Sequence, residues 1–221
     1  MSELYENFIG SKKYWERRYA TGGNSGSGSY GKLAEFKAEI INKFIRENKI
    51  IKVIEFGCGD GNQLSLFKIH EYMGIDIAKT AIEICRERFK GDKTKSFFLY
   101  DPYSFEDKNN FEAELVLSLD VIYHLIEDDV FELYMKHLFL ISNKFVIIYS
   151  SNSNDSSIFS SPHCKNRRFS EWIKINLPEW GLIKEIKNRY PNESNSNFYI
   201  YKKMKRGGGK TKEGNIEEVN L

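Results

Sequence analysis

The chain has 221 residues, and its 16 Phe and 13 Tyr supply enough apolar surface for one folded domain, which excludes a wholly disordered protein. Thirty-three Lys and Arg residues against 31 Asp and Glu residues leave a formal charge of +2, so a polyanion-binding surface over the whole molecule is not expected. Its apolar stretches are far shorter than the roughly 18–20 residues of a membrane-spanning helix, and its acidic N-terminal residues do not resemble a signal peptide, so we expect a soluble cytoplasmic protein.

Residues 1–32 are expected to form a segment separate from the main domain. Tyr14, Trp15 and Tyr19 stand at helical spacing and predict a short amphipathic helix. The helix cannot continue into residues 22–29, which are Gly, Ser and Asn only. This run is either a flexible linker or a loop that faces a ligand.

An α/β domain is predicted over residues 33–203. Apolar residues at three- and four-residue steps predict a helix from residue 33, and a buried strand follows at 50–56. Further strands are predicted at 72–76, 97–100, 115–119 and 145–149, with helices at 78–89 and 128–141 and shorter ones after residue 61 and from residue 169. This alternation predicts a Rossmann-like, mostly parallel seven-stranded sheet with helices on both faces.

The C-terminal part of the chain breaks this alternation. Residues 182–186 and 198–201 predict two strands with no helix between them, which indicates an antiparallel hairpin at one edge of the sheet. Residues 204–221 are polar, basic and rich in glycine, and we expect a disordered tail there.

The strand at 50–56 runs into three glycines, Gly57, Gly59 and Gly61, spaced by one residue. Glycine lets a ligand approach the backbone closely, and ligands of parallel sheets bind at the carboxyl ends of the strands. Glu55 precedes the glycines inside the strand. The pattern E-x-G-x-G-x-G therefore predicts a ligand-binding turn, although a glycine-rich turn alone does not identify the ligand.

Carboxylates recur at the ends of the first four strands. Besides Glu55, these are Asp76, Asp101 and Asp120. A carboxylate at the end of the second strand can accept both hydroxyls of a ribose. The repetition predicts an acidic rim along one edge of the sheet.

With these motifs, residues 50–150 resemble the class I S-adenosylmethionine-dependent methyltransferases. The residues that carry the resemblance are the glycine-rich turn at 53–61, Gly74-Ile75-Asp76, the Asp at 101, and the stretch L-S-L-D-V-I-Y-H-L at 117–125. The resemblance implies the cofactor S-adenosyl-L-methionine and a methyltransferase reaction.

The same resemblance implies cofactor-binding roles for the matching residues. The three glycines would shape the loop beside the methionine part, with Glu55 supporting that loop or holding the cofactor's ammonium through water. Asp76 would bind the ribose hydroxyls, Ile77 would flank the adenine, and Asp101 would lie near the adenine amino group. Asp120 and Val121 would line the wall beneath the transferable methyl group.

Relatives in this family often close their site with an N-terminal helix. The resemblance therefore implies that residues 1–32, with Trp15 and Tyr19, form a lid over the cofactor, and closure of this kind excludes water. A leader that does not order is the alternative.

His124 is the leading candidate for a general base, because it follows the fourth strand on the substrate side and histidine titrates near neutrality. A histidine that only packs or hydrogen-bonds locally is an equal alternative. His163 is the second candidate. Cys58, Cys85 and Cys164 show no CxxC spacing, so no disulfide framework and no metal site are expected.

Residues 150–180 are where this family varies its acceptor contacts, and the predicted acceptor-binding residues are Tyr123, His163, Arg167 and Arg168. The two arginines could clamp a phosphate or carboxylate, although a solvated charge cluster is the more frequent explanation for such a run.

The acceptor is expected to be a small polar metabolite, methylated at oxygen or nitrogen, because the motif of amino-directed nucleic-acid methyltransferases is absent after Asp120. The alternatives are an RNA or protein methyltransferase that uses the basic residues 165–168, and a non-catalytic cofactor-binding subunit. The sequence leaves the oligomeric state open.

Overall fold

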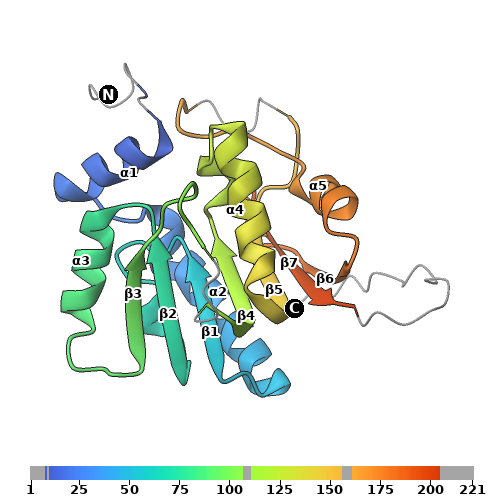
Figure 1. Ribbon diagram of the computed structural model, residues 1–221, viewed down its shortest axis with the longest axis horizontal. Helices are drawn as coiled ribbons and strands as arrows, with labels where there is room; N and C mark the ends of the chain where they lie inside the picture. The colour runs from blue at the N-terminus through green and yellow to red at the C-terminus, as the bar shows by residue number, and fades with distance from the viewer. Residues whose placement is uncertain (1–7, 9, 107–110, 156–160, 205–221) are drawn as a thin grey trace.

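A seven-stranded sheet organises the chain in the computed structural model, which describes residue 8 and residues 10–106, 111–155 and 161–204 (Figure 1). The strand order is β3-β2-β1-β4-β5-β7-β6. The strands are β1 (Lys52–Phe56), β2 (Glu71–Asp76), β3 (Lys95–Leu99), β4 (Ala113–Leu119), β5 (Ser142–Ser150), β6 (Trp180–Ile186) and β7 (Asn197–Lys203).

The sheet is parallel from β3 to β5, and β7 and β6 form the expected antiparallel pair at its edge. The chain moves outward from β1 to β3 and then crosses back to β4 on the other side of β1. Such a reversal opens a crevice at the carboxyl ends of the two central strands, where ligands of open α/β sheets bind. The predicted fold class is confirmed.

Five helices are described: α1 (Ser11–Ala20), α2 (Gly31–Asn48), α3 (Lys79–Arg88), α4 (Asp128–Leu140) and α5 (Phe169–Asn176). Three single turns of 3-10 helix lie in connections between elements: η1 (Ser27–Ser29) between α1 and α2, η2 (Leu64–Leu66) between β1 and β2, and η3 (Ile122–His124) between β4 and α4. The short helix predicted after residue 61 is wrong in extent, because only η2 forms. Phe67 already has extended backbone, and the chain enters β2 at Glu71.

Two apolar layers hold the helices against the sheet. Alternate β1 residues point to opposite faces, so that Val53 packs in the layer with α2, whereas Ile54 packs in the layer with α4 and α5. A further small cluster joins Tyr19 of α1 to Ala78 and Ala81 beside α3. The helix α1 thus lies beside the end of α3, beyond the carboxyl ends of the strands (Figure 1).

None of the described helices is long and apolar enough to cross a membrane. The predicted tail at 204–221 lies outside the described residues except for Met204, whose N–H donates to the carbonyl oxygen of Glu179 at 2.8 Å.

Candidate functional site

A cavity lies at the carboxyl ends of the central strands. Its lining atoms surround about 840 Å³ of empty space, part of which is open to solvent. Segments far apart in the chain contribute to the wall: α1, the Gly/Ser run, α2, and the ends of β1, β2 and β4. Among the lining residues are Trp15, Tyr19, Ser25, Ser29, Lys37, Glu55, Gly57, Gly59, Asp76, Ile77, Asp120, Val121 and His124.

Asp76 fixes the glycine-rich turn. Its buried carboxylate accepts the Gly59 N–H through Oδ2 and the Ala78 N–H through Oδ1, both at 2.9 Å. Burial raises the pKa of Asp76 to about 6, and the two backbone donors oppose this rise. A carboxylate oxygen accepts more than one hydrogen bond, so capacity is left for a ligand.

Gly57 and Gly59 have φ of +79° and +56°, a region that side chains disfavour. A Cβ at Gly57 would lie 2.4 Å from Val121, and a Cβ at Gly59 would lie 2.2 Å from the Ser25 hydroxyl oxygen. Gly61 is not among the residues that line the cavity, and a Cβ there would lie 2.7 Å from the ring of Phe89, which follows α3.

Glu55 is a buried acid at the floor of the cavity. Its Oε2 accepts the Tyr72 hydroxyl proton at 2.5 Å, and it is 3% exposed. Burial raises the pKa of Glu55 to about 7, against the influence of the Tyr72 hydrogen bond and the charge of Lys37.

Lys37 is the functional candidate that the sequence interpretation missed. Its Nζ lies 2.7 Å from Oδ2 of Asp120, and its side chain has no exposed surface. A signal was present in the sequence: Lys37 stands four residues from both Leu33 and Ile41, on the apolar face of the predicted helix. A lone cation at such a position indicates a buried partner.

The Gly/Ser run is ordered against the site. The Ser25 hydroxyl oxygen lies 3.0 Å from the Tyr19 hydroxyl oxygen and accepts the Asp60 N–H at 2.9 Å, while the Ser25 N–H donates to Oδ2 of Asp60 at 3.0 Å. Both Ser25 and Ser29 line the cavity. The run therefore forms part of the cavity wall.

The helix α1 is tied to the domain at its first residue and near its middle. The Ser11 N–H donates to Glu127 at 2.9 Å, and the Ser11 hydroxyl donates to the other oxygen of Glu127 at 2.6 Å. Further along, Glu16 accepts the Thr80 hydroxyl proton at 2.6 Å. Trp15 and Tyr19, which were predicted to cover the cofactor, thereby face the cavity.

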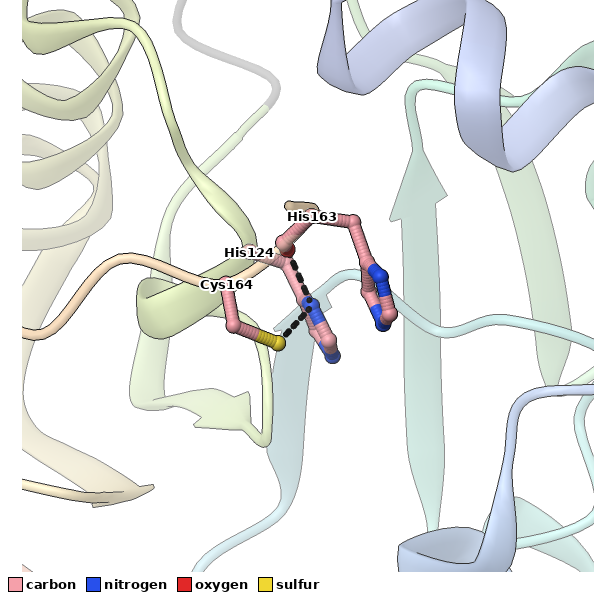
Figure 2. A group of neighbouring side chains, drawn as sticks. All are labelled: His124, His163 and Cys164. Atoms are coloured by element: carbon pink, nitrogen blue, oxygen red, sulfur yellow. Dashed lines mark hydrogen bonds between the residues drawn. The ribbon is translucent and has the colours of Figure 1, made fainter. Parts of the chain in front are cut away.

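His124, His163 and Cys164 form a group beside the cavity (Figure 2). The two imidazoles stack with centroids 5.4 Å apart, and Tyr14 of α1 also stacks with His163, with centroids 4.6 Å apart. The Cys164 sulfur lies 3.6 Å from Nδ1 of His124. His124 stands 39 residues before His163 and its neighbour Cys164, so sequence spacing gave no indication of the group.

The protonation of this group follows from its surroundings. Desolvation lowers the pKa of His124 to about 4 and that of His163 below its usual value, while burial raises the pKa of Cys164 to about 12. The group is therefore uncharged near pH 7. Its ligand-type atoms lie within 4.8 Å of one another, and two imidazoles with a thiol form a donor set of the kind that Zn²⁺ accepts.

The remaining predicted residues do not line the cavity. Asp101 lies in a neighbouring groove, whose lining atoms surround about 630 Å³ of empty space, and pairs with Lys12 at 3.2 Å. Burial, with a further contribution from the charge of Asp120, raises the pKa of Tyr123.

The two arginines that were predicted to bind the acceptor are engaged elsewhere. Arg167 donates to the carbonyl oxygens of Leu125 and Ile126 and pairs with Asp128 at 2.7 Å. Arg168 pairs with Glu171 at 2.9 Å.

Comparison with known proteins identifies the family. The model of the mRNA (guanine-N(7))-methyltransferase domain matches residues 33–161, more than half of the chain. The chain belongs to this methyltransferase family. It is an S-adenosylmethionine-dependent class I methyltransferase, as the sequence motifs predicted.

One curated relative, a small RNA 2'-O-methyltransferase from Arabidopsis thaliana, is 26% identical over 153 residues. The match covers 63% of this methyltransferase, which spans only 16% of that relative's length.

Two solved structures share the fold of this methyltransferase. The N-methyltransferase NodS from Bradyrhizobium japonicum WM9 has a TM-score of 0.70 at 12% identity, covering 88% of this chain and 98% of the other. The methyltransferase domain of bacterial CtHen1-C has a TM-score of 0.59 at 20% identity, covering 78% and 100%.

The cavity suits the charges of S-adenosylmethionine. Three buried or nearly buried carboxylates, Glu55, Asp76 and Asp120, would face a sulfonium and an ammonium, while Lys37 offers a cation to a carboxylate. The described residues therefore fit this cofactor.

Proposed function

We propose that this methyltransferase transfers a methyl group to an oxygen or nitrogen atom of RNA, with the cofactor held in the cavity beneath α1. The sequence interpretation preferred a small metabolite and kept RNA as the alternative. The family model and the curated relative are both named for RNA substrates, which supports the alternative.

The observation that carries this proposal is the basic outer side of α1. Lys13 and Arg17 are exposed, one helical turn apart, and neither forms an ion pair with a described residue. Arg18 lies 5.4 Å from the Trp15 ring centroid. Cations beside the cavity would hold the phosphates of an RNA strand. In contrast, the basic residues within 165–168 already form ion pairs, Lys165 and Arg167 with Asp128 and Arg168 with Glu171.

In this function the chain's residues divide the work. When bound, S-adenosylmethionine supplies a methyl group on a positively charged sulfur. Asp76 would hold the ribose hydroxyls, the glycine turn would lie beside the methionine part, and α1 with Ser25 would exclude water as a lid. His124 accepts a proton from the attacking hydroxyl or amino group through Nε2.

The test is methyl transfer from labelled cofactor to RNA, protein and metabolite fractions, combined with RNA binding at several salt concentrations. Label in RNA is expected. The variant with Lys13→Ala and Arg17→Ala should bind RNA more weakly and with a shallower salt dependence, by roughly 0.7 in the log–log slope for each lost contact with a single strand.

A variant with Lys93→Ala and Lys174→Ala removes the same charge from exposed positions away from the cavity and serves as the control. The proposal would be wrong if label appeared only in metabolites. It would also be wrong if the affinity for RNA did not change between low and moderate salt.

A further inference from the structure

Lys37 is a buried cation that requires a negatively charged partner. Its ammonium is buried at the cavity wall, 2.7 Å from Asp120 and 5.3 Å from the centroid of the Tyr149 ring. Removing an ammonium from water without a compensating negative charge costs several kcal/mol. Lys37 therefore needs a carboxylate partner in every state of the enzyme.

Its partner, Asp120, occupies a strained position at the end of β4. The φ of Asp120 is +58°, a left-handed conformation that few residues other than glycine adopt. Its Oδ1 accepts the Ser196 hydroxyl proton at 3.0 Å, and a Cβ on Gly28 would lie 2.7 Å from Oδ2. The surrounding chain thus holds this carboxylate directly against the cavity.

The ligand brings a competing carboxylate into the same space. Among the described residues that line the cavity, Lys37 is the only Lys or Arg, whereas Glu55, Asp76 and Asp120 are acidic. The methionine part of S-adenosylmethionine carries one carboxylate, and an acidic wall repels it everywhere except at Lys37. Two carboxylates then compete for one ammonium.

We propose that Lys37 exchanges partners during the catalytic cycle, pairing with Asp120 in the cofactor-free enzyme and with the cofactor carboxylate in the loaded enzyme. The exchange rests on the cofactor placement of the proposed function and not on the RNA acceptor. It leaves Asp120, which lies beside Val121 and His124 on the cavity wall, with a free oxygen for the acceptor. Asp120 is thereby a positioning residue that becomes available only after the cofactor has bound.

Calorimetry with two ligands tests the exchange without any acceptor. The first ligand is S-adenosylhomocysteine, and the second is its analogue that lacks only the carboxylate. Asp120→Asn removes the competing charge but retains a side chain that tolerates the left-handed backbone. We expect this variant to bind S-adenosylhomocysteine several-fold more tightly than the wild type and the analogue with unchanged affinity.

Lys37→Met should show the opposite selectivity, losing tenfold or more in affinity for S-adenosylhomocysteine with little change for the analogue. Ser196→Ala removes one hydrogen bond from Asp120 without changing its charge and is the matched control, expected to discriminate little between the ligands. Unchanged or weakened binding of S-adenosylhomocysteine to Asp120→Asn would overturn the exchange.

A crystal structure of the wild-type enzyme with S-adenosylhomocysteine gives a test that does not depend on how the variants fold. Lys37 Nζ should lie within hydrogen-bond distance of the ligand carboxylate and should have left Asp120. Persistence of the 2.7 Å pair would contradict the exchange. If neither ligand bound the wild type, the cofactor placement itself would be wrong.

Discussion

Nδ1 of His124 lies 3.0 Å from the backbone carbonyl oxygen of His163. A carbonyl oxygen only accepts hydrogen bonds, so Nδ1 carries the proton of the neutral ring and Nε2 keeps its lone pair. The edge of the Trp15 ring, 4.9 Å away between centroids, covers the same imidazole. The structure thus prepares one nitrogen of His124 to receive a proton.

Replacing His124 with Ala should lower kcat roughly 100-fold, the usual contribution of a general base, while the affinity for S-adenosylhomocysteine stays within about twofold. Turnover and calorimetry measure the two effects. His70→Ala is the control because that side chain is exposed and distant from the cavity wall. A variant with near-normal kcat would assign His124 a packing role.

The pH dependence of kcat offers a second test of His124. Its pKa is lowered to about 4 by burial, and a base acts in its deprotonated form. The rate should therefore rise with pH up to about 5 and stay flat from pH 6 to 8. A midpoint near 6.5, the ordinary pKa of histidine, would show that His124 is solvated in the working enzyme.

Asp76→Ala should weaken S-adenosylmethionine binding by more than tenfold, about 1.4 kcal/mol, because the variant loses both the ribose acceptor and the bonds that fix Gly59 and Ala78. Asp76→Asn keeps one acceptor oxygen and should lose less. Calorimetry compares the two variants, and an unchanged affinity of Asp76→Ala would refute this placement of the ribose.

Glu55 should make the enzyme less stable as pH rises. Its pKa is raised to about 7 in the folded state, so the folded protein binds more protons than the unfolded chain between the unfolded pKa and pH 7. Below about pH 4.5 Glu55 is protonated in both states and does not lower the free energy of unfolding. As pH rises from there through 7, its ionisation lowers the free energy of unfolding by up to about 3 kcal/mol.

Glu55→Gln keeps an acceptor for the Tyr72 hydroxyl and cannot ionise. Urea unfolding of the ligand-free protein at several pH values should show a smaller decline between pH 5 and 8 for this variant than for the wild type. Parallel curves would indicate that Glu55 does not titrate in this range.

Substitution of Arg167 should lower the free energy of unfolding more than substitution of Arg168, although the two residues are adjacent in sequence. Arg167→Ala removes donors to two backbone carbonyls and a contact with the Phe131 ring at 4.7 Å, and we expect a loss of about 1–3 kcal/mol. Arg168→Ala removes an exposed pair with Glu171 and should change the free energy of unfolding by less than about 0.5 kcal/mol. Equal effects in chemical denaturation would contradict this assignment.

The order and type of the main elements could be predicted because each has its own local pattern. Buried strands such as β5 contain an unbroken apolar run, here residues 145–149, and α2 has the period of an amphipathic helix. The extent of the helix predicted after Gly61 was wrong because a few apolar residues there fit either a helix or the single turn η2. The N-terminal helix was predicted, but its attachment through Glu127 depends on a residue 116 positions away.

The candidate site could be predicted where its residues follow strand ends, as Asp76 and Asp120 do, since topology brings those ends together. Lys37 was missed because its chemistry depends on a partner from another element. The proximity of Cys164 to His124 was missed for the same reason. The charge of Arg167 is evident from the sequence, but its ion pair with Asp128 is evident only from the fold.

The contacts of α1 also have a consequence for how the protein is made. Tyr14 stacks on His163, and Ser11 is held by Glu127, so two of the contacts that fix this helix come from segments that are synthesised much later. Contacts between residues so distant in sequence form after loop closure has been achieved. During translation, Tyr14 therefore lacks this stacking partner until residue 163 has left the ribosome.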